Sequence, residues 1–189
     1  MKHVKVLFII VFLFFITTTL SAQFQSWSKL MSFNANYASL KGEVTGNTFD
    51  GYAFDFTYEH VNSKGDMAGG ILIAYLAGHD EDTENERRIN YQSIPIYLQG
   101  KYLFGSESIM GYLQGGIGLQ FSRIELTGPN LLLQDGDSGF ALNLGLGGYF
   151  FTGEKIFINA AYNFNYLVNS FYQDGMVHMI KVGIGFQSI

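Results

Sequence analysis

The chain has 189 residues and a formal net charge of −5, with 16% aromatic residues, 23 glycines and only two prolines. The lack of cysteine excludes a disulfide scaffold, a thiol nucleophile and a cysteine-based metal site. The acidic balance provides no basic patch for nucleic acid, so nucleic acid is not an expected partner. An excess of aromatic residues and glycine favours strands over helices.

The N-terminus has the pattern of a secretory signal. Lys2 and Lys5 precede the apolar run Val6–Ile16, and a short stretch of small and polar residues ends at Ala22. The run has 11 residues, too few for a membrane helix, which needs about 20. We therefore expect a signal peptide at residues 1–22 and an outer-membrane β-barrel domain at residues 23–189, with an uncleaved anchor as the alternative. Without Lys2 and Lys5, 9 basic residues stand against 16 acidic ones, a net charge of −7.

Eight segments of the mature chain alternate between two classes of side chain, which predicts strands with two different faces. In chain order these segments are Met31–Tyr37, Tyr52–Glu59, Ala68–Tyr75, Ser93–Phe104, Tyr112–Phe121, Phe140–Phe150, Ile158–Tyr166 and Ile180–Gln187. We expect each strand to have about 9–13 residues, which is enough to cross a bilayer at a tilt. Ordinary globular strands average only about 5–6 residues.

The predicted links between strands alternate in length. Short, turn-like links fall at Asn62–Asp66, Gly105–Ser108 and Thr152–Lys155, and longer polar links fall at Ser39–Asp50, Ala77–Asn90, Ser122–Ser138 and Val168–Gly175. Short turns on one side and long loops on the other are typical of outer-membrane barrels, whose turns face the periplasm. An even number of strands places both termini on the turn side.

These patterns predict an all-β fold, an eight-stranded antiparallel up-and-down transmembrane β-barrel. Hydrocarbon offers no water to backbone N–H and C=O groups, so a spanning sheet must close on itself. An eight-stranded lumen is just wide enough for side chains. Six glycines on the proposed inner face suit such a narrow lumen: Gly116, Gly118, Gly145, Gly147, Gly183 and Gly185.

Four charged residues are predicted to meet inside the barrel. Asp55 and Glu59 lie on the polar face of one strand, and Lys101 and Lys181 are the inward-facing cations of two others. An unpaired charge in a closed lumen is costly. We therefore expect these four residues to form a polar network that plugs the lumen.

A soluble barrel of the lipocalin type is the rival interpretation, in which the apolar face surrounds a ligand. Periodicity alone does not say which face is outside. The polar face here is rich in glycine and asparagine, whereas a water-facing surface carries lysine and glutamate. This composition favours lipid on the apolar face.

The segment Ile89–Phe104 resembles a strand of the outer-membrane β-barrel, porin-like family, and Gly111–Phe121 and Phe140–Phe151 resemble the glycine-rich strands that follow it. The resemblance covers the mature chain and implies an OmpX/OmpW-like barrel in the outer membrane with no catalytic residues. Pro95 cannot donate to a sheet ladder, so we expect a bulge or local irregularity there. Phe186 is expected to serve as the terminal aromatic that the barrel-assembly machinery recognises.

The polar constellations outside the lumen do not predict an active site. His60, His79 and His178 are scattered, and Ser170, the hydroxyl nearest to His178 in sequence, forms no recognisable pair with it. The acidic run His79–Arg88 lacks the spacing of a calcium loop, and a solvated loop is the preferred interpretation. Leu131, Leu132 and Leu133 are expected to extend a strand, rest on the outer leaflet or touch a partner.

We therefore expect a monomeric outer-membrane protein in contact with membrane lipid, with no enzymatic activity, cofactor or bound metal. The preferred function is structural or surface-interacting, through the extracellular loops of a largely plugged barrel. One alternative is a narrow channel or conduit for small, hydrophobic molecules. A lipid-modifying enzyme is the third hypothesis, and it requires His, Ser and acid to converge at the outer rim.

Overall fold

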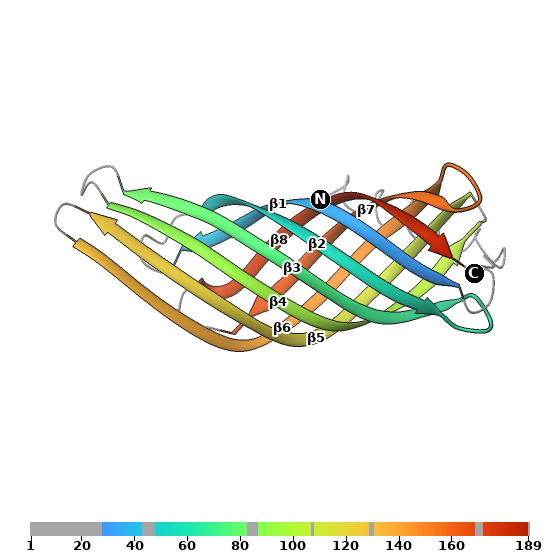
Figure 1. The fold of residues 1–189 in the computed structure, drawn as a ribbon, viewed down its shortest axis with the longest axis horizontal. Helices are drawn as coiled ribbons and strands as arrows, with labels where there is room; N and C mark the ends of the chain where they lie inside the picture. Colours follow the sequence, from blue (N-terminus) through green and yellow to red (C-terminus); the bar gives the residue numbers. More distant parts are fainter. Residues whose placement is uncertain are drawn as a thin grey trace, which may run out of the picture.

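The computed structural model describes residues 28–42, 48–82, 87–106, 108–128, 131–168 and 172–188. Within these ranges the chain forms one closed, all-antiparallel barrel in which each strand pairs with the next and β8 pairs with β1 (Figure 1). The strands are β1 Lys29–Gly42, β2 Thr48–Val61, β3 Met67–Asp82, β4 Arg87–Gly105, β5 Ile109–Gly128, β6 Leu131–Phe151, β7 Ile156–Leu167 and β8 Tyr172–Ser188. The predicted fold class is confirmed, and the predicted signal peptide lies outside the described residues.

The stagger of the strands fixes the size and tilt of the barrel. A row of paired residues that leaves β1 at Leu30 passes through every strand and returns to β1 at Leu40, ten residues further along. With a rise of about 3.3 Å per residue and about 4.8 Å between strands, this stagger tilts the strands by about 40° from the axis. Such a row therefore climbs from the turn end of the barrel towards the loop end as strand number increases.

The apolar face of the sheet points outwards. Phe140 is 71% exposed, and Leu98 and Ile117 are each 65% exposed, whereas Asn143, Asn159 and Gln120 are almost completely buried. A lipocalin-like barrel would have the opposite arrangement. The alternation also holds at β3, where the buried Leu72 and Ala74 alternate with the exposed Ile71, Ile73 and Tyr75.

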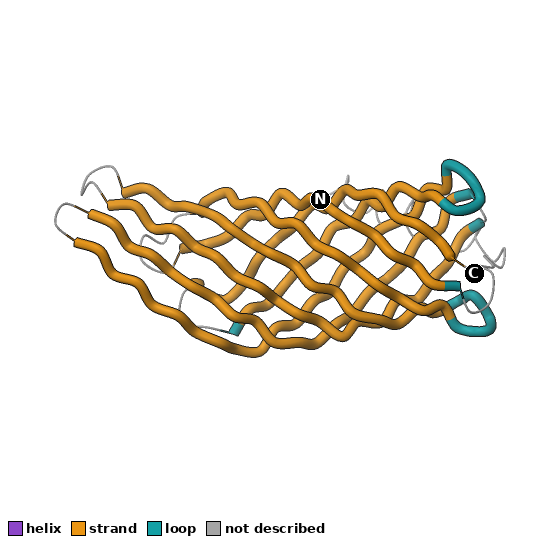
Figure 2. Tube along the Cα trace, viewed as in Figure 1, coloured by secondary structure: helices purple, strands orange, loops and turns teal. Residues whose placement is uncertain are grey.

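The links at one end are short, as predicted, and Figure 2 shows them as small turns. In the first of them, Gly65 adopts a left-handed φ of 74° and donates from its N–H to the carbonyl of Asn62 at 3.2 Å. This conformation favours glycine, because a side chain there is strained.

The long loops predicted at the other end are largely strand. β3, β4, β5 and β6 contain 16, 19, 20 and 21 residues, and β1, β2 and β8 contain 14, 14 and 17. The expected length of about 9–13 residues therefore holds for β7 alone, with 12 residues, and was wrong for the other described strands. The stretch Ser122–Ser138, predicted as a loop, is a continuation of β5 and β6 apart from residues 129–130, which lie outside the described chain. Strand extension was one of the expected roles of Leu131–Leu133, and it is the one observed.

The four long strands project beyond the rest of the barrel. In Figure 1, β3–β6 reach further at the left-hand end than β1, β2, β7 and β8. The pairing of β6 with β7 ends at Ala141 and Leu167, so, among the described residues, residues 131–139 pair with β5 alone. We call this projecting sheet, residues 79–82, 87–92, 123–128 and 131–139, the loop-end extension.

At Pro95 the structure has the second of the two expected outcomes, a local irregularity without a bulge. The register between β4 and β5 runs through Pro95 and Gln120 without a shift. On the β3 side, paired residues stop at Ile73 and Ile96 and resume at Leu76 and Ser93 in the same register. The missing N–H is therefore absorbed by a local gap in one ladder, which costs hydrogen bonding and leaves the register intact.

Candidate functional site

The first buried ion pair lies in the lumen between β2 and β4. The Lys101 ammonium is 3.0 Å from each oxygen of the Glu59 carboxylate, and it donates to the Tyr149 hydroxyl at 2.6 Å. Gln99 and Tyr149 donate to the same carboxylate at 2.7 and 3.0 Å. The ammonium also lies 4.5 Å from the ring centroid of Tyr112, a favourable cation–π geometry. Both charged groups are almost fully buried, so each depends on the other for compensation.

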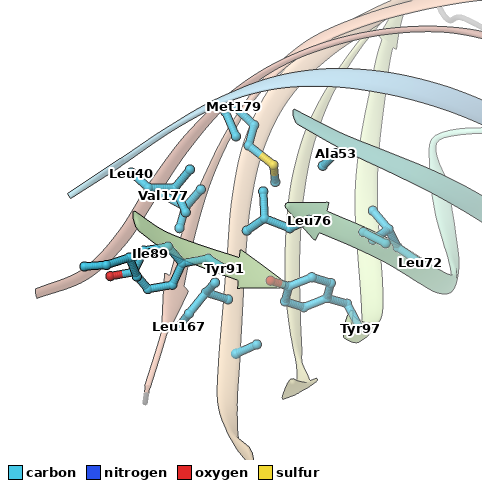
Figure 3. Close-up of a cluster of buried hydrophobic side chains, with 13 residues drawn as sticks. Leu40, Ala53, Leu72, Leu76, Ile89, Tyr91, Tyr97, Leu167, Val177 and Met179 are labelled. Carbon is cyan, nitrogen blue, oxygen red and sulfur yellow. The ribbon is translucent and has the colours of Figure 1, made fainter. Parts of the chain in front are cut away.

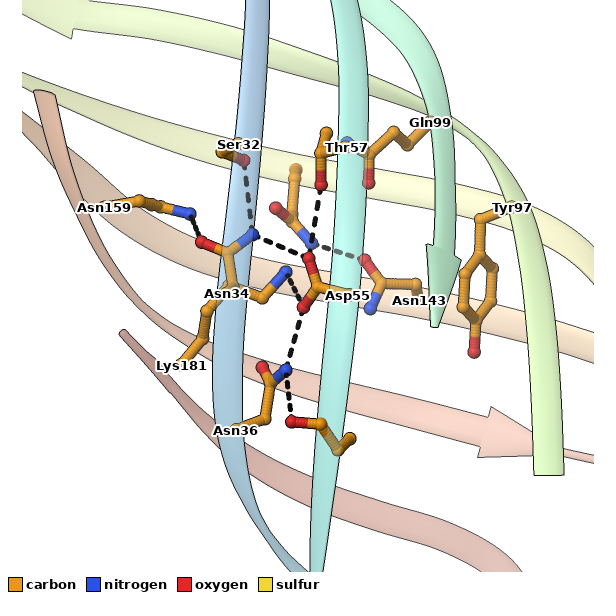
Figure 4. Close-up of polar contacts among 12 residues, drawn as sticks. Ser32, Asn34, Asn36, Asp55, Thr57, Tyr97, Gln99, Asn143, Asn159 and Lys181 are labelled. Carbon is orange, nitrogen blue, oxygen red and sulfur yellow. Dashed lines mark hydrogen bonds and ion pairs between the residues drawn. The ribbon is translucent and has the colours of Figure 1, made fainter. Parts of the chain in front are cut away.

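The second ion pair joins β8 to β2. The Lys181 ammonium is 2.9 Å from the Asp55 carboxylate, which also accepts from the amides of Asn34 and Asn36 at 2.7 and 2.8 Å. Figure 4 shows Asp55 at the centre of these contacts, with Thr57 donating from the neighbouring position of β2. Asp55 therefore has its charge balanced and its acceptors occupied, as a buried carboxylate requires.

Side chains from distant parts of the sequence connect the two pairs. The Tyr112 hydroxyl donates to Asn159 at 2.8 Å, and Asn159 donates to Asn34 at 2.8 Å. Asn34 in turn donates to Asp55. The structure thus brings Asp55, Glu59, Lys101 and Lys181 into one network across the lumen.

Clusters of buried apolar side chains lie inside the barrel on both sides of this network. Towards the loop end, thirteen buried residues form a cluster that includes Leu40, Leu76, Ile89, Tyr91 and Val177 (Figure 3). Towards the turn end, a second cluster contains eight, among them Leu30, Leu103, Met110, Tyr149 and Phe157. The inward-facing side chains of the described strands are therefore arranged in three layers, apolar, polar and apolar.

Glycines make room for the large side chains of these layers. A β-carbon at Gly147 would lie 2.6 Å from the Tyr112 ring and hydroxyl, and one at Gly185 would collide with the Phe157 ring. The rings of Tyr112 and Tyr149 pack against each other in a tilted arrangement, with their centroids 4.7 Å apart. The inner-face glycines thus hold space that aromatic rings occupy.

Hydrogen bonding of the buried polar atoms is less complete on one side of the polar layer than on the other. Asn163 on β7 is buried, and neither its amide nitrogen nor its amide oxygen has a hydrogen-bond partner among the described residues. The nearby Gln114 oxygen and Asn165 nitrogen are also unpartnered. The charged β1, β2 and β8 side of the lumen therefore contributes more to polar satisfaction than the amide-rich β5–β7 side.

The three histidines in the described part of the chain lie far from one another. His60 contacts the Tyr58 hydroxyl through Nε2 at 3.0 Å, and His79 is exposed on β3. His178 faces outwards, as its parity predicts, and its ring lies against Tyr162 and Phe164 of β7. Its cross-strand neighbour on the other side is Ser39, and Ser170 lies outside the described residues. The His178 ring therefore leans away from β1 and towards an aromatic neighbourhood.

No group of three acidic or histidine side chains within the described ranges is arranged to hold a metal ion. In the acidic run, Glu81 lies 3.8 Å from Arg88 across the β3–β4 hairpin. Both side chains are more than half exposed, so this pair contributes little stability.

No helix in the described part of the chain is long and apolar enough to cross a membrane.

The sequence from residue 8 to residue 187 matches the family described as the outer membrane protein beta-barrel domain. The chain belongs to this family. Its place is therefore the outer membrane, with the apolar belt of the barrel in contact with lipid. No curated protein sequence matches the chain closely enough to count as a relative.

Solved structures share the fold of this outer-membrane β-barrel at low sequence identity. Neisserial surface protein A is 13% identical over 84% of this chain and 96% of its own, with a TM-score of 0.60. The attachment invasion locus protein Ail of Yersinia pestis, in complex with the heparin analogue sucrose octasulfate, is 15% identical over 86% and 99%, with a TM-score of 0.58. A major outer membrane protein from Thermus thermophilus is 10% identical over 84% and 99%, with a TM-score of 0.55.

Sequence reasoning missed the apolar layers and the hydroxyl partners of the first ion pair. The alternation along β5 and β6 puts Tyr112 and Tyr149 on the inner face with the glycines, but nothing in the sequence pattern indicates that both lie beside Lys101. The inward position of Phe157 could have been found from the same alternation, because its neighbours Ile156 and Ile158 are both exposed.

Proposed function

We propose that this outer-membrane barrel acts through its loop-end extension, in a structural and surface-interaction role, and that its filled lumen serves stability in place of transport. The observation that supports the proposal is the arrangement of inward side chains in three layers, with two buried ion pairs between two apolar clusters. A conduit would need a continuous wet path past these layers. We infer no enzymatic role.

The loop-end extension supplies a surface for such a role. Its four hydrogen-bonded strands hold side chains in fixed positions, unlike a mobile loop. Leu132 and Leu133 near its tip are 62% and 56% exposed. Exposed apolar side chains on a rigid sheet, with charged residues around them, suit contact with another macromolecule.

The charge of the extension favours a cationic partner. Its strands carry six carboxylates, on Asp80, Glu81, Asp82, Glu125, Asp135 and Asp137, against three arginines, Arg87, Arg88 and Arg123. Ail was crystallised with a polyanion, a heparin analogue. The acidic excess here would repel such a ligand at long range and attract a basic one.

We infer that the chain works as a monomer inserted by the barrel-assembly machinery. Within the described part of the chain, β6 has a free edge at residues 131–139, where another strand could pair. The Asp135 carboxylate accepts from the Gly136 N–H, and the Asp137 carboxylate accepts from the Ser138 N–H, both at 2.8 Å. These aspartates occupy edge donors that a second strand would need.

Two measurements test the proposal on the barrel refolded in lipid. Planar-bilayer recordings should show negligible conductance, and steady openings would support the conduit alternative instead. Vesicles that display the wild-type barrel should bind a decalysine probe more tightly than heparin. The triple variant Glu125→Gln, Asp135→Asn, Asp137→Asn should weaken decalysine binding, and equal binding by wild type and variant would contradict the surface role.

A matched variant separates the extension from the rest of the barrel. Replacing residues 123–136 by Asn-Gly joins the paired residues Ser122 and Asp137 through a two-residue hairpin. This shortened barrel should keep the heat-modifiable gel migration of a folded barrel and lose decalysine binding. Retained binding would place the contact elsewhere.

A further inference from the structure

The outer surface of the barrel has a groove across β1–β4 that the proposed function does not use. The groove has a volume of about 630 Å³ and is lined by outward-facing apolar side chains. They are Phe33 and Ala35 of β1, Phe54 and Phe56 of β2, Ile73 and Tyr75 of β3, and Ile94 of β4. Phe33 and Phe56 pack with their ring centroids 5.0 Å apart. The small Ala35 leaves the space between these larger side chains.

The groove follows two adjacent rows of paired residues. One row contains Phe33, Phe56 and Ile73, and the other contains Ala35, Phe54 and Tyr75. Because such rows climb towards the loop end from β1 to β4, the lowest part of the groove lies on β1. Its lower end therefore faces the membrane leaflet on the turn side.

Closer to the turn end than the groove, β1 and β2 carry polar and basic side chains on the outer face. Lys29 and His60 are exposed on the outer face and are cross-strand partners. No ion pair of Lys29 occurs among the described residues. The Tyr58 hydroxyl contacts His60 Nε2 at 3.0 Å, and a hydroxyl that donates to Nε2 leaves the Nδ1–H as a donor to an anion.

The spacing of these features matches a phospholipid. Lys29 lies four residues before Phe33, which corresponds to about 10 Å along the barrel axis at the tilt and rise given above. A phosphate at Lys29 and His60 would lie at the level of the headgroups, and an acyl chain rising from it would enter the groove. Interfacial lysines and tyrosines commonly mark this level of a membrane protein.

We propose that β1–β4 hold one anionic phospholipid of the turn-side leaflet, with its phosphate at Lys29 and His60 and an acyl chain in the groove over Ala35. The cationic side chain selects the charge of the headgroup, because a basic residue near an anionic lipid surface contributes about 1 kcal/mol. The groove holds the chain through contact with four aromatic rings, which a smooth barrel wall would not supply.

Native mass spectrometry of the refolded full-length barrel tests this assignment. The barrel in neutral detergent is mixed with equal amounts of dipalmitoyl phosphatidylglycerol and dipalmitoyl phosphatidylcholine. One phosphatidylglycerol should be retained in preference. Lys29→Gln should lower this preference about fivefold, while the control Lys155→Gln, an exposed lysine in the β6–β7 turn, should leave it unchanged. Equal retention of the two lipids, or equal effects of the two lysine variants, would overturn the headgroup site.

The groove is tested separately by filling it. Ala35→Phe should abolish retention, and the control Ala160→Phe, a lipid-side alanine on β7, should not. Heat-modifiable migration reports whether each variant folds, and Ala35→Leu is the smaller filling if the phenylalanine variant does not fold. Dihexanoyl phosphatidylglycerol, whose chains are too short to fill the groove, should be retained weakly. Retention unaffected by groove filling or by chain length would overturn the acyl-chain assignment.

Discussion

The pair between Glu59 and Lys101 makes the sharpest prediction about what stabilises the barrel. Lys101→Met removes the ammonium that lies 3.0 Å from both carboxylate oxygens, and leaves Gln99 and Tyr149 as the donors to Glu59. The carboxylate then stays buried without a balancing charge. Breaking a buried pair in this way costs about 3–5 kcal/mol. The free energy of unfolding should fall by that amount.

A double variant shows how much of the loss in stability comes from the lost contact and how much from a buried charge left without its partner. Glu59→Gln together with Lys101→Met removes both charges, so its loss of stability should be smaller than the sum of the two single losses by about 1–3 kcal/mol. Urea unfolding of the refolded barrel in lipid vesicles, followed by circular dichroism, measures each value. Lys155→Met on the exposed turn is the matched control and should change nothing. Additive single losses, or a loss below about 1 kcal/mol for Lys101→Met, would refute the reasoning.

Three further predictions follow from the lumen and the free edge. Gly147→Leu should lower the free energy of unfolding by at least about 1–3 kcal/mol in the same urea assay, because the new side chain collides with Tyr112; an unchanged value would contradict the packing. Asn163→Leu should raise it by about 1 kcal/mol, because both amide atoms are buried without partners; a large loss would show an unseen partner. Asp135→Ala with Asp137→Ala should produce dimers in detergent, seen by light scattering, and a strictly monomeric variant would contradict the protective role of these carboxylates.

The faces of the strands could be predicted from the sequence because the membrane makes the two sides chemically different. Inside the bilayer an outward residue meets lipid and an inward one meets a narrow lumen, so the alternation around Asp55 and Glu59 is sharp. Beyond the bilayer both faces of a strand meet water. The alternation between apolar and polar residues is then lost, as in Gln134–Ser138. For that reason the sequence pattern predicted ends of β5 and β6 that lie short of the observed ones.

The partners across the lumen could not be predicted, because they depend on the stagger of the strands. Asn34 and Asn159 are 125 residues apart and bond directly, while Tyr149 reaches Glu59 across 90 residues. Parity places each of these side chains inside the barrel. Which of them share a level is decided by the ten-residue shift around the barrel, and no single segment of sequence encodes that shift.

The central claim is that the apolar face of each strand touches lipid while the glycine-and-amide face fills the lumen. The chain has no cysteine, so single-cysteine variants can report each face without interference. Leu144 is 60% exposed and its neighbour Asn143 is buried, so Leu144→Cys and Asn143→Cys compare the two faces at one level of β6. A nitroxide label at Leu144→Cys in a reconstituted bilayer should collide with lipid-soluble oxygen, and the thiol of Asn143→Cys should resist labelling in the folded barrel. Ready labelling of Asn143→Cys by a water-soluble reagent, with Leu144→Cys hidden from lipid, would contradict the account.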